Sequence, residues 1–118
     1  MIIAVDFDGV IVEDKFPEIG EVDCVVVSAL KLLQTMGHKL ILWTSRVNGR
    51  LAEAVDTCDR VGLKFDAINS GEPGNLAEYG TDPRKVYADV YIDDHSIWYT
   101  KSLLYAWLNK MVKESNNE

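Results

Sequence analysis

Histidine, cysteine and positive charge are scarce in this sequence, and each shortage excludes a class of function. The two histidines form no convincing pair with a serine, so a serine nucleophile activated by histidine is not expected. The two cysteines lack a Cys-x-x-Cys spacing, which argues against a zinc site and against a disulfide framework. The formal net charge of −7 does not attract the backbone of a nucleic acid, so a nucleic-acid partner is not expected.

Long apolar runs and targeting signals are lacking as well. No run approaches the length of a transmembrane helix, so we expect no membrane partner. Met1 leads directly into a strand pattern without a basic segment or a cleavage site, which predicts that there is no signal peptide. Cys24 and Cys58 lie on apparent helix faces, as isolated buried thiols do in a reducing compartment. These features together predict a soluble, cytoplasmic protein.

Short apolar runs alternate with amphipathic segments along the chain. The length of 118 residues predicts a single domain, residues 1–118, with no room for a substantial second one. Strands are expected at 2–5, 40–43, 63–68 and 90–92, and helices at 23–36, 48–61 and 99–113. Glycine and proline predict a flap or short loop at 9–22 and a long loop at 69–84. This order predicts an α/β fold, a Rossmann-like, mostly parallel sheet flanked by helices.

Acidic residues follow two of the predicted strands. Asp6-Phe7-Asp8-Gly9 comes directly after strand 2–5, and Asp93-Asp94 comes directly after strand 90–92. Because the carboxyl ends of parallel strands converge on one crevice, we expect the two acidic pairs to meet there. Carboxylates this close repel one another unless a cation or a proton lies among them, and Mg²⁺ is the first candidate. A calcium loop is excluded, because it needs glycine at its sixth position, whereas Gly9 is at the fourth position when Asp6 is the first.

The same acidic residues offer a nucleophile. Carboxylates attack phosphorus in phosphoryl transfer and form an aspartyl-phosphate. Asp6 lies at the strand end, where its geometry is most rigid, and is therefore the natural nucleophile. Asp8, two residues on, can protonate the leaving oxygen and later activate water. Gly9 lets backbone and substrate approach closely.

A bound phosphate also needs hydrogen-bond donors. Thr44 ends the second predicted strand, and its hydroxyl and the neighbouring backbone N–H groups, Ser45 among them, can hold a phosphoryl oxygen. Lys85 leads toward the second acidic pair and can offset its charge, although a solvated surface lysine is an equal alternative. Arg46 and Arg84 are second-tier candidates for binding phosphate.

Taken in order, these residues resemble the haloacid dehalogenase (HAD) superfamily of phosphohydrolases. Its motifs are Asp-x-Asp-Gly after the first strand, a threonine or serine ending the second, a lysine, and a late acidic pair. They read here as Asp6-Phe7-Asp8-Gly9, Leu40-Ile41-Leu42-Trp43-Thr44, Lys85 and Tyr91-Ile92-Asp93-Asp94. The first and fourth motifs are specific together, and the resemblance covers residues 1 to about 98.

The resemblance implies a HAD-like fold and a Mg²⁺-dependent phosphomonoester hydrolase. Asp6 would be the nucleophile, Asp8 the general acid and base, and Thr44 and Lys85 the ligands of the phosphoryl group. The short spacing between Thr44 and Lys85 leaves no room for a cap domain. The substrate would be a phosphorylated small molecule of unknown identity, with nucleotides among the candidates.

The resemblance also implies a metal site and a state of assembly. The ligands of Mg²⁺ would be Asp6, the backbone carbonyl of Asp8, and Asp94, with Asp93 in support or also ligating. Members without a cap tend to use large substrates or to form oligomers in which a neighbour covers the site. A homo-oligomer is therefore an expectation, for which Tyr105 and Trp107 on the final helix offer apolar surface.

Two other functions compete with the hydrolase. A receiver-type signalling domain has a similar length and an early acidic pair, but its acceptor aspartate should end a strand near positions 55 to 70. Asp66 lies inside a strand pattern instead of after it, which disfavours that interpretation. The second alternative is a HAD fold retained only for binding, without catalysis.

Overall fold

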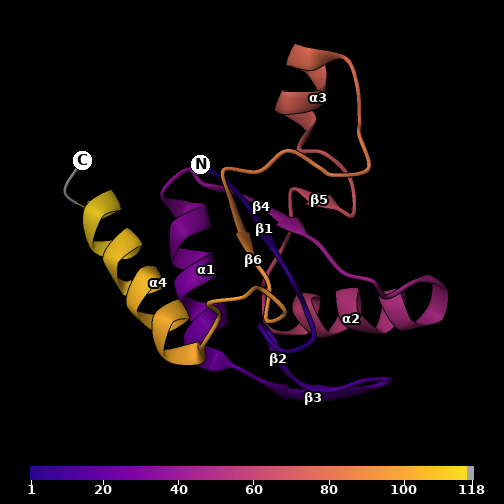
Figure 1. Cartoon of the computed structure of the whole chain (residues 1–118), viewed down its shortest axis with the longest axis vertical. Coiled ribbons are helices and arrows are strands. Elements are labelled where there is room, and N and C mark those ends of the chain that lie inside the picture. The colour runs from indigo at the N-terminus through magenta and orange to yellow at the C-terminus, as the bar shows by residue number, and fades with distance from the viewer. Residues whose placement is uncertain (117–118) are drawn as a thin grey trace.

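The computed structural model describes residues 1–116 and has a four-stranded parallel sheet at its centre (Figure 1). The strands are β1 (Ile2–Val5), β4 (Lys39–Leu42), β5 (Ala67–Ile68) and β6 (Val90–Ile92), in the spatial order β5-β4-β1-β6. Every neighbouring pair is parallel, so all four carboxyl ends lie at one edge of the sheet. The expected α/β fold with a Rossmann-like sheet in a single small domain is thus confirmed.

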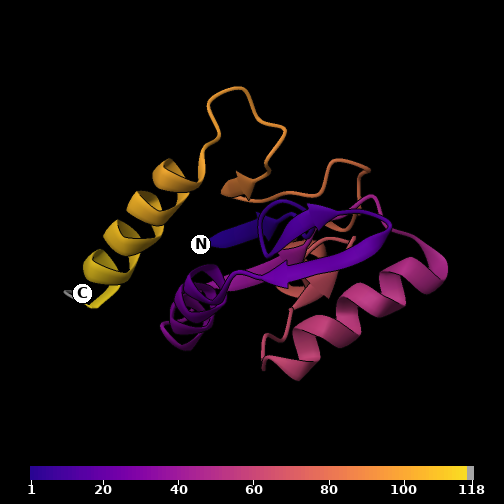
Figure 2. The same ribbon diagram turned by 90° about the horizontal axis from the view of Figure 1, so that it is seen from below.

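Three helices cover one face of the sheet. They are α1 (Cys24–Thr35), α2 (Asn48–Arg60) and α4 (Lys101–Asn116), and Figures 1 and 2 both show α4 beside α1. Alternate strand residues such as Ile3 and Val5 point to this face and share one core cluster with buried residues of all three helices. Burial of this large apolar face is the main stabilising contribution to the fold.

The opposite face of the sheet has a much thinner cover. Ala4 and Ile41 form a small second cluster with Val86 and Ala88, which belong to the extended segment that leads into β6. The hydroxyl of Tyr91 holds this segment, since it donates to the carbonyl of Val86 at 2.7 Å and accepts from the N–H of Ala88 at 3.2 Å.

The predicted limits of the first two helices are confirmed. Asp23 caps α1, where its side chain accepts from the backbone N–H groups of Val25 and Val26. Gly37 and Gly62, with φ values of 98° and 78°, follow α1 and α2 and adopt the left-handed conformation that glycine tolerates best.

The segments expected to be a flap and a long loop contain regular structure. Residues 12–22 form an antiparallel hairpin of β2 (Val12–Lys15) and β3 (Glu18–Val22). The long loop contains a short helix, α3 (Pro73–Tyr79), because Glu72 caps its start, Pro73 favours the first turn and Gly80 ends it at a φ of 75°.

Two further expectations are wrong in detail. The third strand is limited to Ala67–Ile68, because the Asp66 carboxylate accepts the N–H of Leu40 at 2.8 Å in place of a strand carbonyl. Cys58 is buried, and burial raises the pKa of its thiol to about 12, but Cys24 is exposed at the start of α1.

None of the helices within residues 1–116 combines the length and the apolar composition needed to cross a membrane.

Candidate active site

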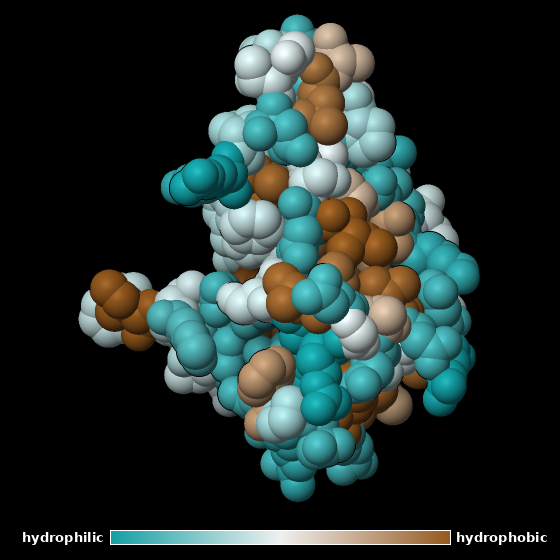
Figure 3. Space-filling view, turned by 90° about the vertical axis from the view of Figure 1, so that its right-hand side faces the viewer, coloured by the Kyte–Doolittle hydropathy of each residue, from teal (hydrophilic) through white to brown (hydrophobic). Residues whose placement is uncertain are grey.

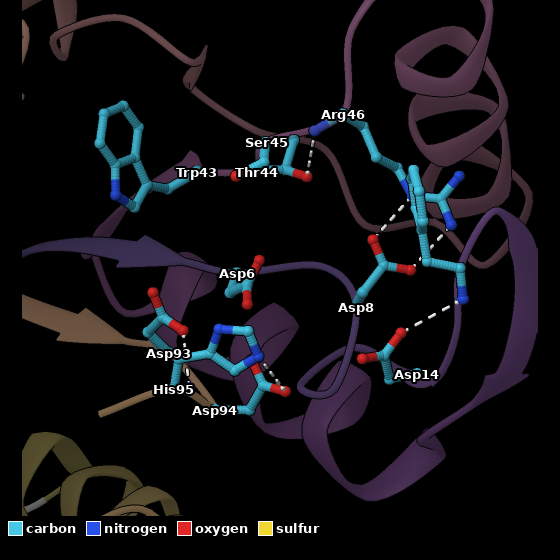
Figure 4. A pocket seen from close by; sticks show the side chains of 11 residues that line it. Asp6, Asp8, Asp14, Trp43, Thr44, Ser45, Arg46, Asp93, Asp94 and His95 are labelled. Carbon is cyan, nitrogen blue, oxygen red and sulfur yellow. Dashed lines mark hydrogen bonds and ion pairs between the residues drawn. The ribbon is translucent and has the colours of Figure 1, made fainter. Parts of the chain in front are cut away.

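The register of β1 against β6 brings the two acidic motifs together. Val5 pairs with Ile92, so the next residues, Asp6 and Asp93, leave the sheet side by side, and the N–H of Asp6 donates to the carbonyl of Ile92 at 2.8 Å. Figure 4 shows the acidic side chains gathered at this edge. They line a cavity of about 520 Å³ together with polar and aromatic residues from β4 and the hairpin: Asp6, Asp8, Asp14, Phe16, Trp43, Thr44, Ser45, Arg46, Asp93, Asp94 and His95.

Uncompensated negative charge is concentrated around Asp6. Burial, the hydrogen bond that its protonated form makes with Asp94, and the charge of Asp93 together raise the pKa of Asp6 to about 8. Asp93, Asp94 and His95 offer ligand atoms that all lie within 4.8 Å of one another. The Nε2 atom of His95 lies 3.8 Å from Oδ2 of Asp94.

This donor set fits a hard divalent cation. Asp93 and Asp94 belong to one compact group of ligand atoms with His95, and Asp6 lies within hydrogen-bonding reach of Asp94 and in the field of Asp93. Carboxylate oxygens are the ligands that Mg²⁺ prefers. Burial, Asp94 and Asp93 raise the pKa of Asp6, which favours a bound proton on this carboxyl when no cation is present. The structure therefore brings together the side chains of three of the four predicted metal ligands.

The side chain of Asp8 is held by Arg46. Nε and Nη2 of Arg46 donate to the two carboxylate oxygens of Asp8 at 2.7 and 2.8 Å. The hydrogen bond to Asp8 raises the pKa of the guanidinium. A two-point pair of this kind fixes both partners in orientation as well as in charge.

Arg46 also binds the hairpin. Its remaining N–H groups donate to the carbonyls of Pro17 and Glu18 at 3.2 and 3.0 Å and, more weakly, to that of Arg50 at 3.5 Å. The guanidinium lies 5.3 Å from the ring centre of Phe7 and 5.0 Å from that of Phe16. Arg46 is 2% exposed, and all five of its N–H donors are engaged, so it has none left for the predicted contact with a phosphate.

Thr44 and Ser45 lie where they were predicted, on the rim above Asp6 (Figure 4). The hydroxyl oxygen of Thr44 accepts from the N–H of Arg46 at 3.1 Å, so its own proton is available for an acceptor. Asn69, which follows β5, fixes this turn, because its side-chain oxygen accepts from the N–H of Thr44 at 2.8 Å. The sequence had given no reason to single out Asn69.

Lys85 is the predicted site residue that the structure places elsewhere. It is exposed and is not part of the cavity lining, and its Nζ lies 5.4 Å from the ring centre of Tyr91. Arg84 is exposed beside it. Among residues 1–116, Arg46 is thus the sole lysine or arginine that lines this cavity.

Gly9 is required by a close approach to Asp94. Its φ is 87°, and a Cβ atom at this position would overlap the Asp94 carboxylate. Two residues near the start of α4 donate hydrogen bonds to the same loop. Tyr99 donates its hydroxyl to the carbonyl of Gly9 at 3.0 Å, and Lys101 donates to that of Val10 at 2.7 Å.

The structure adds residues to the cavity lining that the sequence did not assign to the site. Asp14 and Phe16 of the hairpin line the cavity; the sequence did not single them out individually, although their position in the insert directly after the first motif is a usable signal. Trp43 packs against the second core cluster and also lines the cavity. His95 is exposed at the rim, and Trp98 is exposed over a separate apolar groove.

Comparison with known proteins places the chain in a family. No protein-family model matches it, and no curated protein does either. A solved structure, of a conserved protein from Bacteroides thetaiotaomicron, is 41% identical to it, with a TM-score of 0.78. The match covers 93% of this chain and 90% of that one, so the chain belongs to the same family as that conserved protein.

Removal of Arg46 should destabilise the protein. In Arg46→Met the Asp8 carboxylate loses its partner, and breaking a largely buried pair costs about 3 kcal/mol in the free energy of unfolding. Arg50→Met is the matched control, because Arg50 pairs with Glu53 in solvent, where the loss should stay below about 0.5 kcal/mol. Urea denaturation measures both. Equal effects of the two substitutions would show that the Arg46 network contributes little.

The stability of the metal-free protein should depend on pH through Asp6. The carboxyl ionises near 3.8 in the unfolded chain and near 8 in the folded one, so the folded state holds the proton more tightly. Its contribution to stability therefore falls as the pH rises from about 4 to about 8. Asp6→Asn removes this loss, so its stability relative to wild type in EDTA should increase over that range. A difference that does not change with pH, measured by urea denaturation, would contradict the assignment.

Proposed function

We propose that the protein is a Mg²⁺-dependent phosphomonoester hydrolase of the HAD type. The observation that carries this proposal is the meeting of Asp6 with Asp93 and Asp94 at the carboxyl ends of adjacent parallel strands. Thr44 lies on the same rim with a hydroxyl proton to donate. A carboxylate nucleophile, an oxygen-rich cation site and a donor for phosphate are the parts that phosphoryl transfer requires.

The reaction begins at Asp6. Its carboxylate oxygen attacks phosphorus, the bond from phosphorus to the ester oxygen breaks, and the leaving oxygen takes a proton from Asp8. Water then attacks the aspartyl-phosphate, Asp8 accepts a proton from that water, and inorganic phosphate leaves with the Asp6 carboxylate restored. In the structure both oxygens of Asp8 accept from Arg46, as an ionised carboxylate does. To act as the acid in the first step, Asp8 must therefore give up one of these hydrogen bonds and take up a proton from solvent; in the second step it regains that proton from the attacking water.

The negative charge of the site must be offset before a phosphate can bind. Asp6, Asp93 and Asp94 would hold Mg²⁺, whose charge would neutralise these carboxylates and the phosphoryl oxygens. Lys85 has no part in this arrangement because it lies outside the cavity, which makes the dependence on a cation stronger. Thr44 and the backbone N–H of Ser45 complete the contacts offered to the phosphate.

A binding protein without turnover is the second candidate. The position of Lys85 and the engagement of Asp8 by Arg46 are the observations that favour it. Hydrolysis of p-nitrophenyl phosphate with Mg²⁺ and with EDTA separates the two functions. Turnover that requires Mg²⁺ supports the hydrolase, and its absence supports the binding protein.

Assembly and location belong to the same proposal. A homo-oligomer would cover the open site, but Tyr105 donates its hydroxyl to Asp23 and Trp107 packs on the core, so these two residues support it less than expected. Exposed Ile97 and Trp98 beside the acidic cluster offer other apolar surface. A cytoplasmic location is supported by two cysteines that are both free.

Asp6→Asn should abolish turnover of p-nitrophenyl phosphate and leave the fold intact. The amide is a much weaker nucleophile, and although Ser45 and His95 both line the cavity, no hydrogen bond among the described residues joins them into a nucleophile–base pair. Asp56→Asn on the exposed surface of α2 is the matched control and should retain full activity. If folded Asp6→Asn retained more than about 5% of the wild-type rate, the aspartyl-phosphate route would be wrong.

Asp94→Asn should weaken the binding of Mg²⁺ by at least about tenfold, because it removes one negative ligand from the cluster. Titration calorimetry measures this directly and needs no substrate. Asp59→Asn, which changes a carboxylate on α2 that pairs with Lys64, should bind Mg²⁺ as wild type does. Unchanged affinity in Asp94→Asn would remove Asp94 from the metal site.

A further inference from the structure

We propose that the hairpin makes the site selective for phosphomonoesters whose leaving group carries an aromatic ring and no further negative charge. This inference rests on the proposed hydrolase activity and specifies its substrate class. Two residues of the hairpin carry it, Asp14 in β2 and Phe16 in the turn that follows, and both line the cavity.

The position of Asp8 sets the direction of the leaving group. The leaving oxygen must lie near Asp8 to receive its proton. Figure 4 shows Asp8 on the side of Asp6 that faces Asp14 and Arg46, whereas Trp43 lies on the other side. The group attached to the leaving oxygen therefore extends toward the hairpin.

Phe16 presents a fixed aromatic surface in that direction. Arg46 lies over its ring at 5.0 Å, and the carbonyls of the next two residues, Pro17 and Glu18, accept from the same guanidinium. The ring is nevertheless 59% exposed. A ring held in place and open to the cavity gains contact with a planar ligand at little cost in conformational entropy.

The electrostatic field on that side disfavours a second negative group. Asp14 lies beside Phe16, where its carboxylate accepts the Phe16 N–H at 3.2 Å. Among the described residues, Arg46 is the sole lysine or arginine that lines the cavity, and its five N–H groups are engaged. Lys15, between Asp14 and Phe16, is exposed and does not line the cavity. A carboxylate or a second phosphate on a leaving group that contacts Phe16 would thus meet the charge of Asp14 without a free cationic donor in the cavity lining.

Four synthetic esters test both halves of the inference. Benzyl phosphate and cyclohexylmethyl phosphate have leaving groups of similar size and acidity, and they differ in the aromatic ring. Benzyl phosphate and its 4-carboxy and 4-aminomethyl derivatives differ in charge. The expected wild-type kcat/KM with Mg²⁺ is about 3- to 10-fold higher for the benzyl than for the cyclohexylmethyl ester. The 4-carboxy ester should be about threefold worse than benzyl and the 4-aminomethyl ester no worse, and salt should reduce this difference.

Matched variants assign each preference to its residue. Phe16→Leu should bring the benzyl and cyclohexylmethyl esters to equal kcat/KM, and Trp98→Leu, which changes an exposed aromatic residue outside the cavity, should leave their ratio unchanged. Asp14→Asn should remove most of the penalty on the 4-carboxy ester. Glu13→Gln alters an exposed carboxylate on the same strand that does not line the cavity, and it should preserve that penalty.

The outcomes distinguish this inference from the proposed activity. Equal wild-type rates on all four esters, or preferences that survive in Phe16→Leu and Asp14→Asn, would overturn the inference while turnover of p-nitrophenyl phosphate still supported the hydrolase. Absence of turnover on every ester, p-nitrophenyl phosphate included, would overturn the hydrolase and the inference together.

Discussion

Repulsion among the carboxylates of Asp6, Asp93 and Asp94 is the constraint on which the site depends. The pairing of β1 with β6 forces these groups together, and the large apolar face beneath the sheet holds that pairing in place. The fold therefore holds together groups that repel one another, and burial together with Asp94 and Asp93 raises the pKa of Asp6. A cation resolves it, so binding of Mg²⁺ and stability of the folded chain are expected to be linked.

Arg46 compensates a further negative charge in the same cavity. Asp8 would add a further negative charge to the cavity, and the guanidinium both neutralises it and joins it to the hairpin. The residue that controls the orientation of the proposed proton donor is thus also the residue that holds the ring of Phe16 and the hairpin carbonyls beside it. The buried side chain of Arg46 therefore serves both the proposed proton transfer and the proposed selectivity. A substitution in the hairpin is expected to alter the orientation of Asp8 through it.

The sequence predicted features that depend on neighbouring residues or on general rules of parallel sheets. The cap at Asp23, the helix end at Gly37 and the meeting of the two acidic motifs belong to this group. α3 was missed although Glu72, Pro73 and Gly80 are ordinary signals, because glycine and proline had been counted as loop residues alone. The pairing of Arg46 with Asp8 joins residues 38 positions apart, and the exposed position of Lys85 depends on how its segment crosses the sheet. Contacts of this kind follow from tertiary packing and have no local signature.

The contacts of Tyr99 and Lys101 with the carbonyls of Gly9 and Val10 span 90 and 91 positions of the chain. Asp94 must likewise be present before Gly9 can adopt its close packing. During synthesis, the first motif leaves the ribosome long before any of these partners exists. In a nascent chain, Arg46 and local hydrogen bonds are available to the acidic loop early, but the contacts from the second half of the chain are lacking until residue 101 has emerged. Support of the acidic cluster therefore cannot be complete before then.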